Sequence, residues 1–269
     1  YNLKDLKTLR TERVMKYNFN IEGSEKEIYY EADETFSVYS YKTKSDKFIV
    51  IGSSATLSQE YRYIDADKPD GEIKLFDKRV DDLEYSISHF DDKWFIITNK
   101  DNATNFKLMV CEEGKTNSKN WVDFIPHRDD TLLEGIDIFK DYLVVTERNN
   151  GLRKIQIRPW NGEKNHYIEF DEETYYLGLA MNDDYKATTL YFTYNSMTTP
   201  SSIYAYDMFT GKQSLWHQKQ IMDPGFDTKN YTSERIWARA NDGTEVPISL
   251  VYKKGTDLLS LIHISEPTR

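Results

Sequence analysis

The chain has 269 residues, a formal net charge of −10 at pH 7 and one cysteine, Cys111. This length allows one large domain or two small ones, with a substantial core. The acidic balance argues against a nucleic-acid-binding protein, which normally carries a basic patch. A single cysteine excludes an intramolecular disulfide and fits a reducing compartment. Neither a signal peptide nor a membrane-spanning apolar run is visible, so we expect a cytoplasmic protein that does not engage membranes.

Aromatic residues are abundant, with 20 Tyr, 13 Phe and 5 Trp. Aromatic and β-branched residues favour strands. Asn- and Asp-containing turns separate the apolar segments, as at residues 161–162 (NG) and 241–243 (NDG), and such residues suit tight turns. The composition therefore predicts an all-β protein.

In chain order, the first expected strand covers residues 26–32 (KEIYYEA), which resembles the last strand of a unit whose start is missing. Four similar units follow. Each has a strongly apolar core strand, and these cores begin at residues 47, 93, 141 and 189, which are 46 to 48 residues apart. The cores cover residues 47–52, 93–98, 141–146 and 189–193. A strand that is covered on both faces loses its alternation of polar and apolar residues, so we expect these four to be buried on both faces.

Three further strands accompany each core. An alternating strand precedes it, at residues 35–42, 83–90, 133–140 and 175–182. A third strand follows it, at residues 60–67, 105–112, 151–160 and 201–208. A shorter fourth strand ends the unit, at residues 72–77, 120–125, 165–170 and 213–217. Four strands per unit at this period is the signature of a β-propeller blade.

We therefore expect a partial β-propeller over residues 1–217, with about four blades and a stub. Propellers usually close with four to eight blades, so this number favours a piece of a larger ring, and a closed four-bladed ring is the alternative. Residues 218–230 have no periodicity and are expected to be a linker. Residues 231–240 and 245–252 then alternate around the turn at residues 241–243, which predicts a β-hairpin.

No motif in the chain supports catalysis. The nearest approach to a nucleophile elbow, Gly52-Ser53-Ser54-Ala55, lacks the second glycine and a following helix, so we expect a blade loop there. Phosphate-binding, zinc and paired-cysteine motifs are absent. Cys111 lies in a strand-like run and is expected to be a buried thiol. We therefore assign no catalytic, no cofactor-binding and no metal-binding residue and expect no cofactor. The remaining candidates are histidines at strand ends, expected to be hydrogen-bonded edge residues, namely His89, His127, His166 and His217.

Several strings along the chain resemble oligopeptidase B (protease II), in the prolyl oligopeptidase family of serine peptidases. They occur in the order that the family shows, and together they span almost the whole chain. They are residues 57–62 (LSQEYR), 98–107 (TNKDNATNFK), 125–128 (IPHR) with 133–141 (LEGIDIFKD), 194–202 (YNSMTTPSS) and 231–252.

This resemblance implies a seven-bladed propeller that caps an α/β-hydrolase domain. It implies a cytosolic serine endopeptidase that cleaves short peptides after Arg or Lys and whose propeller gates access to the catalytic domain. The expected partners are short basic peptides and that intramolecular domain. Residues 231–258 correspond to its first hairpin, so none of the family's triad residues can be carried over. The chain as given is expected to be inactive.

The last eleven residues, 259–269 (LSLIHISEPTR), resemble translated adapter sequence from DNA library preparation. We expect this tail to be an artefact and the natural protein to continue after about residue 258. Two alternatives to the endopeptidase remain open at this point. One is the propeller of a proline-directed oligopeptidase, and the other is a non-enzymatic propeller that acts as a binding scaffold.

Overall fold

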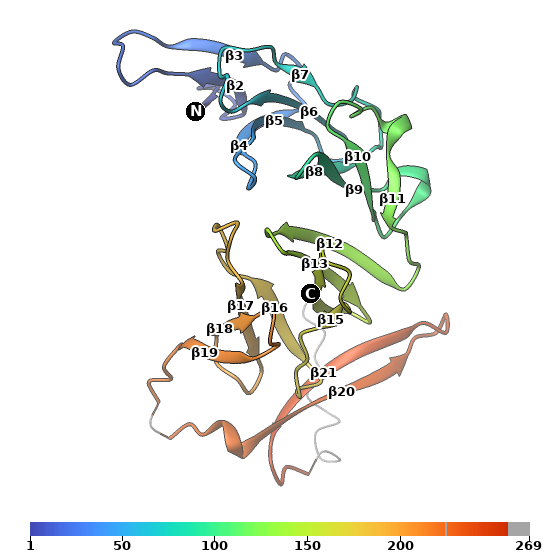
Figure 1. Cartoon of the computed structure of the whole chain (residues 1–269). Helices are drawn as coiled ribbons and strands as arrows, with labels where there is room; N and C mark the ends of the chain where they lie inside the picture. The colour runs from blue at the N-terminus through green and yellow to red at the C-terminus, as the bar shows by residue number, and fades with distance from the viewer. Residues whose placement is uncertain (224, 258–269) are drawn as a thin grey trace. The chain divides into compact units, whose positions relative to one another are not determined.

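The computed structural model describes residues 1–223 and 225–257, so the adapter-like tail at 259–269 lies outside the described residues (Figure 1). The chain divides into two compact units. Unit 1 comprises Tyr1–Lys140 and Asp183–Tyr185, and unit 2 comprises Asp141–Asn182 and the chain from Lys186 onward.

Unit 1 consists of antiparallel sheets whose neighbouring strands follow one another in sequence. A three-stranded sheet comes first, with β1 (Asn2–Lys4), β2 (Thr11–Lys16) and β3 (Lys26–Tyr30). Two four-stranded sheets follow, namely β4 (Ser37–Lys42), β5 (Phe48–Ser54), β6 (Gln59–Asp65) and β7 (Lys74–Leu75), then β8 (Tyr85–Phe90), β9 (Lys93–Thr98), β10 (Lys107–Glu112) and β11 (Val122–Ile125). The strand β12 (Thr131–Ile138) completes the unit, with two 3-10 turns at Lys100–Asn102 and Ser118–Asn120.

Unit 2 continues the same pattern. The strands β13 (Tyr142–Asn149), β14 (Leu152–Pro159) and β15 (His166–Tyr167) pair in order. A four-stranded sheet follows, made of β16 (Tyr175–Leu179), β17 (Thr189–Ser196), β18 (Ser202–Asp207) and β19 (Gln213–Gln218). After a 3-10 turn at Thr228–Asn230, β20 (Tyr231–Arg239) and β21 (Glu245–Lys253) form a separate hairpin.

The prediction of an all-β fold built from four-stranded antiparallel units is confirmed. Three of the four core strands, β5, β9 and β13, are buried on both faces, as expected, and five of the six residues of β9 are buried. For β17 the prediction was wrong, because its buried residues alternate with half-buried ones. The aromatic rings of Phe48, Tyr63 and Phe76 surround the fully buried Trp94, with centroids 5.0, 5.2 and 5.3 Å from its ring. This cluster joins side chains from both four-stranded sheets of unit 1 and forms its main core.

The strand expected at residues 26–32 is β3, the last strand of a three-stranded unit, as predicted. Its partners β1 and β2 were not predicted, because they carry few buried residues and gave no apolar signal. A second local prediction was wrong. The expected loop at Gly52-Ser53-Ser54-Ala55 is instead the end of β5, which includes the first three of these residues. Ser53 is polar but buried, because its hydroxyl donates to the carboxylate of Glu31. Small residues in a strand were therefore mistaken for a turn.

A carboxylate shapes one loop of unit 2. Glu172 accepts hydrogen bonds from the hydroxyls of Ser196, Thr198 and Thr199 at 2.6, 2.5 and 3.0 Å, and from that of Tyr194. Burial alone would raise the pKa of Glu172, but these four donors outweigh it and lower the pKa below its usual value. The hydroxyl-rich string at residues 194–199 thus folds this loop around a half-buried anion.

Candidate functional site

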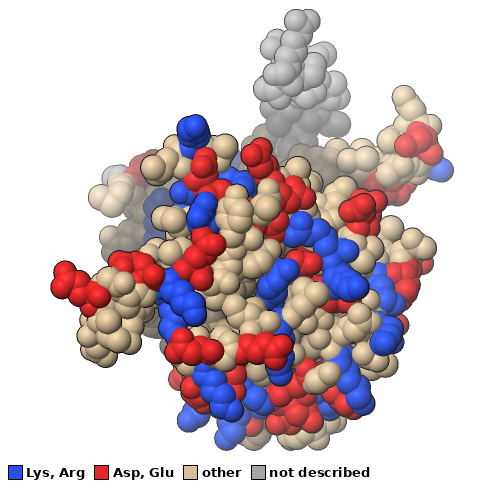
Figure 2. Space-filling view, turned by 90° about the horizontal axis from the view of Figure 1, so that it is seen from above, with Lys and Arg blue, Asp and Glu red and all other residues tan. Residues whose placement is uncertain are grey.

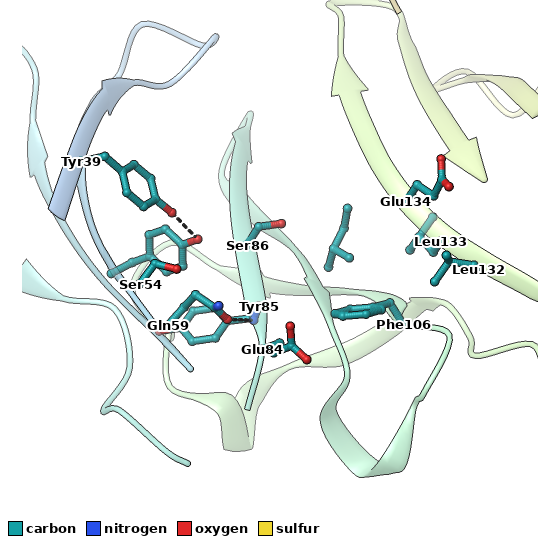
Figure 3. Close-up of a pocket in the computed structure, with 12 residues that line it drawn as sticks. Tyr39, Ser54, Gln59, Glu84, Tyr85, Ser86, Phe106, Leu132, Leu133 and Glu134 are labelled. Atoms are coloured by element: carbon teal, nitrogen blue, oxygen red, sulfur yellow. Dashed lines mark hydrogen bonds between the residues drawn. The ribbon is translucent and has the colours of Figure 1, made fainter. Parts of the chain in front are cut away.

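A groove with a volume of about 460 Å³ is the candidate binding site in unit 1. The first strands of three successive repeats, β4, β8 and β12, contribute to it, together with parts of β5, β6, β9 and the loop before β10 (Figure 3). We call it the inner-strand groove. The side chains used in the argument below are those of Tyr39, Gln59, Tyr61, Glu84, Ser86, Phe106 and Glu134.

Two tyrosines form one wall of the inner-strand groove. Their hydroxyl oxygens, on Tyr39 and Tyr61, are 2.8 Å apart and hydrogen-bonded. The Tyr39 ring lies over Gly52, where an added Cβ would come within 2.4 Å of the tyrosine Cζ. Burial raises the pKa of Tyr39 and of Tyr61, so both hydroxyls stay neutral and able to donate or accept. The glycine therefore makes room for an aromatic wall with polar tips.

Strand β8 forms the floor. Its alternation buries Tyr85 and Ile87 and leaves Ser86 exposed toward the groove. The backbone N–H of Tyr85 donates to Oε1 of Gln59 at 2.9 Å, which links β8 to β6 (Figure 3). The backbone of Glu84 is fixed by Asn99, whose Oδ1 accepts from its N–H at 2.9 Å. The half-buried Glu84 side chain is therefore carried on a rigid segment.

Phe106 forms the other aromatic part of the lining. Its φ angle is +56°, a left-handed conformation that bulky residues adopt only when their surroundings impose it. The neighbouring Asn105 imposes it here, because its side-chain amide donates to the backbone oxygens of Arg128 and Asp129 at 3.0 and 2.8 Å. The Asn105 carbonyl also accepts from the N–H of Leu133 at 2.9 Å. The loop before β10 is thus tied to the start of β12 and presents the half-buried ring at the groove.

The charges of the inner-strand groove have one sign. Glu84 and Glu134 carry carboxylates, and its lining contains no Lys, Arg or His. Elsewhere acidic and basic side chains are interspersed, as on the face shown in Figure 2. The groove therefore suits a ligand with a cationic group and apolar surface. Its lining offers hydroxyls, carboxylates and aromatic rings, which are groups that can contact such a ligand.

His89 was a histidine candidate from the sequence, and it connects two polar side chains through hydrogen bonds. Its Nδ1 is 2.8 Å from the Ser45 hydroxyl and its Nε2 is 2.8 Å from Oε1 of Glu113. The ring is 2% exposed and packs against Phe48 and Trp94. Burial lowers the pKa of His89, so the neutral imidazole accepts from Ser45 and donates to Glu113. The arrangement joins a serine, a histidine and a carboxylate and borders a cavity of about 220 Å³, but both imidazole nitrogens are engaged in these two hydrogen bonds.

Arg79 and Glu31 form the centre of a second buried polar cluster in unit 1. Their Nη2 and Oε2 atoms are 2.6 Å apart, and Glu31 also accepts from the hydroxyl of Tyr29 and the N–H of Asp33. Burial would raise the pKa of Glu31, but its donors, Ser53 and Arg79 foremost, lower it to about 2. This cluster ties the segment after β3 to the segment after β7, so its role is to hold repeats together.

The other sequence candidates do not gather into a site. Within residues 1–223 and 225–257, no three His, Cys, Asp or Glu side chains are placed to hold a metal ion. Cys111 is buried, and burial raises the pKa of its thiol to about 12, which makes it a poor nucleophile. In the described part of the chain, no helix is long and apolar enough to cross a membrane.

Sequence reasoning missed the inner-strand groove. Its residues come from three repeats and one loop, and only their pairing in space brings them together. Two local signals point toward it. One is Gly52 inside an apolar strand, which indicates that a side chain approaches the backbone closely. The other is the asparagine-rich loop at residues 99–105, since asparagine tolerates left-handed backbone.

Comparisons with known proteins agree with this architecture. Residues 1–219 match the family model described as "Prolyl oligopeptidase, N-terminal beta-propeller domain". Dipeptidyl aminopeptidase BI of Pseudoxanthomonas mexicana is 36% identical over 93% of the chain, and Protease 2 of Moraxella lacunata is 31% identical over 86%. The chain spans only about a third of these relatives, 34% and 33% of their lengths.

Solved structures give the same result. Oligopeptidase B from Leishmania major matches with a TM-score of 0.85 and 25% identity, covering 96% of this chain and 37% of that one. Oligopeptidase B from Trypanosoma brucei matches with a TM-score of 0.86 and 26% identity, covering 96% and 38%.

Proposed function

The chain belongs to the prolyl oligopeptidase family through its N-terminal β-propeller domain, and we propose that it is the propeller portion of a serine endopeptidase that hydrolyses short peptides after Arg or Lys. The observation that carries this proposal is the likeness to two oligopeptidase B structures over 96% of the chain. The net charge of −10 supports basic peptides as substrates, because an acidic protein attracts them electrostatically. We also propose a cytoplasmic location, supported by the single, buried cysteine.

The role proposed for the propeller is to gate access to the catalytic domain. A gate must be rigid where it meets the substrate, and the inner-strand groove has that property. Its walls are fixed by the Tyr39–Tyr61 hydrogen bond and by the tied loop that presents Phe106. Opening between domains would then admit peptides, which is a conformational step of the lid type.

We propose that residues 231–258 begin the α/β-hydrolase domain, after the linker at 218–230. Support comes from one face of the hairpin, where Ile236, Val246 and Ile248 are 43%, 43% and 37% exposed. The register pairs Ile236 with Ile248, so the three side chains lie on one face. An exposed apolar face of this kind indicates a surface that another part of the protein covers. We propose that this face is covered by the part of the protein that corresponds to the remaining length of the relatives.

The opposite face of the hairpin already has contacts within unit 2. The Arg235 guanidinium donates to the carbonyl of Asn150 in the β13–β14 turn, and its backbone N–H donates to Glu173 at 3.1 Å. The Thr174 hydroxyl donates to that of Ser249 at 2.9 Å. The hairpin thus contacts the blades through Arg235 and Ser249, while Trp237 and Val251 on the same face remain 47% and 45% exposed. Both faces therefore carry apolar surface that another domain could cover.

The dipeptidyl aminopeptidase relative supports a second candidate function, which is the removal of N-terminal dipeptides. Fluorogenic peptides separate the candidates when the full-length enzyme is assayed. Cleavage of an N-terminally blocked Arg substrate supports the endopeptidase, whereas cleavage restricted to unblocked dipeptide substrates supports the aminopeptidase. Cleavage after Pro alone would indicate the proline-directed alternative.

Two controls complete this test. The 269-residue chain should hydrolyse none of these substrates, and turnover by it would contradict the assignment of the chemistry to a separate domain. The gene beyond the Leu258 codon should encode a Gly-Gly-Ser-Ala-Gly-Gly-like elbow within a few hundred residues. Its absence would exclude the peptidase candidates and leave the binding scaffold.

A further inference from the structure

We propose that the inner-strand groove binds the side chain of an arginine residue in a short peptide. This inference deepens the proposed function, on which it rests, by giving the propeller a contact with the substrate as well as a gating role. The occupant is set by three properties of the groove, which are its charge, its aromatic walls and its rigidity.

The charge of the lining selects a cation. Glu84 is the charged residue on which this selection depends, and the lining contains no basic side chain that competes for it. The carboxylate of Glu84 receives one long hydrogen bond of 3.4 Å from Asn99 Nδ2, which leaves its second oxygen available within the groove. A guanidinium group can donate to a carboxylate in a bidentate manner, so one Arg side chain fits this requirement.

The aromatic walls favour Arg over Lys. Tyr39 and Phe106 lie on either side of Ser86 in the view of Figure 3. A guanidinium plane stacks on aromatic rings, whereas the more strongly hydrated ammonium of Lys does so less readily. The groove volume of about 460 Å³ lies within the usual range for small-ligand sites and accommodates a side chain with part of its backbone.

Rigid support makes the groove a binding surface that exists before the peptide arrives. The Tyr39 ring is fixed by its contact with Gly52 and by its hydrogen bond to Tyr61. Phe106 is held in a left-handed conformation by the anchored Asn105. A preformed site loses little conformational entropy on binding, so even a small ligand can be recognised.

The test is an NMR titration of the isotopically labelled 269-residue chain with N-acetyl-arginine amide. N-acetyl-citrulline amide, which is nearly isosteric but neutral, serves as the matched ligand. We expect the arginine amide to bind at least fivefold more tightly and to shift the backbone amide signals of residues 84–86 and 106. Binding should weaken in 0.5 M salt, because the groove carboxylates are partly exposed to solvent.

Three variants locate the binding energy. Glu84→Gln keeps an acceptor for Asn99 but loses the charge, and it should weaken arginine amide binding about two- to fivefold. Phe106→Gly removes the ring while relieving the left-handed backbone, and it should also weaken binding about two- to fivefold. Glu34→Gln removes an exposed carboxylate outside the groove and should leave the affinity unchanged.

Equal affinity for arginine and citrulline amides, shifts confined to other residues, or an unchanged affinity in Glu84→Gln would overturn the proposal. If Phe106→Gly does not fold, the citrulline comparison and Glu84→Gln still decide. The titration measures binding by this chain, which performs no hydrolysis. Absence of arginine amide binding is therefore distinct from absence of the proposed peptidase activity, which is measured on the full-length enzyme. Binding by this chain alongside full-length cleavage at other residues would assign the groove to recognition without the Arg/Lys cleavage preference.

Discussion

Replacing Arg79 by methionine is expected to destabilise unit 1 more at neutral pH than in acid. The substitution removes the cation that faces Glu31 at 2.6 Å, but it keeps an unbranched side chain that can still cover the ring of Phe36. The Arg79 charge lies 3.5 Å from that ring in the native protein. The loss of unfolding free energy in this variant therefore measures mainly the contribution of the buried ion pair.

The magnitude follows from the pKa of Glu31. Its folded pKa of about 2 lies below the usual 4.5, so the carboxylate stabilises the fold fully above pH 4.5 and progressively less as the pH falls toward 2. This difference corresponds to at most about 3 kcal/mol of unfolding free energy. Glu31 has other donors and Arg79 is partly exposed to solvent, so we assign about 2 kcal/mol to this pair. At pH 3 roughly half of that loss should remain.

Urea titrations between pH 3 and pH 8 measure the effect. Trp94 and Trp121 are buried in unit 1, so their fluorescence follows its unfolding once the unit 2 tryptophans, Trp160, Trp216 and Trp237, are replaced by Phe. Lys42→Met is the matched control, because it removes an exposed ion pair with Asp46 and should cost less than about 1 kcal/mol. A loss for Arg79→Met that is the same at pH 3 and pH 7, or no larger than the control's, would refute the reasoning.

Three further outcomes are expected. Gly52→Ala should cost about 1 kcal/mol in urea titrations and displace Tyr39, because the new Cβ would meet that ring, whereas Gly114→Ala, with open space around it, should be tolerated. His89 has a folded pKa below 6.5, so the stability that depends on its neutral form is complete above pH 6.5 and declines below it; His89→Gln should therefore show a shallower fall in unfolding free energy from pH 7 to pH 5. Cys111 should resist a thiol reagent at pH 8 until urea unfolds the chain, and rapid native labelling would contradict its burial.

The sequence predicted the core strands well, for a physical reason. The residues of β9 and β13 are covered on both faces, and such burial requires an unbroken apolar run that stands out in the sequence. The short outer strands were harder to place. Only Lys74–Leu75 and His166–Tyr167 are paired in β7 and β15, although longer strands were expected there. An edge strand has one neighbour and little burial, so its length is set by turns that leave a weak sequence signal.

The candidate site was not predictable in the same way. Ser86 and Tyr39 belong to alternating strands, and alternation alone indicates which residues face away from the core. It does not indicate what they face. The left-handed Phe106 depends on hydrogen bonds from Asn105 to residues more than 20 positions away, which no local pattern records.

The inner-strand groove and the aromatic core are built from the same strands. Tyr85 and Ile87 of β8 pack in the core, while Ser86 of β8 and Glu84, which directly precedes the strand, remain accessible at the groove. Because the period of a strand is two, substitutions at the accessible positions change the groove without altering the buried face. Core positions and groove positions thus alternate along β8, while Tyr61 and Tyr85 belong both to the core and to the groove lining. Glu84, whose backbone is fixed but whose side chain is half-buried, is the position where we expect substitution to change the groove most.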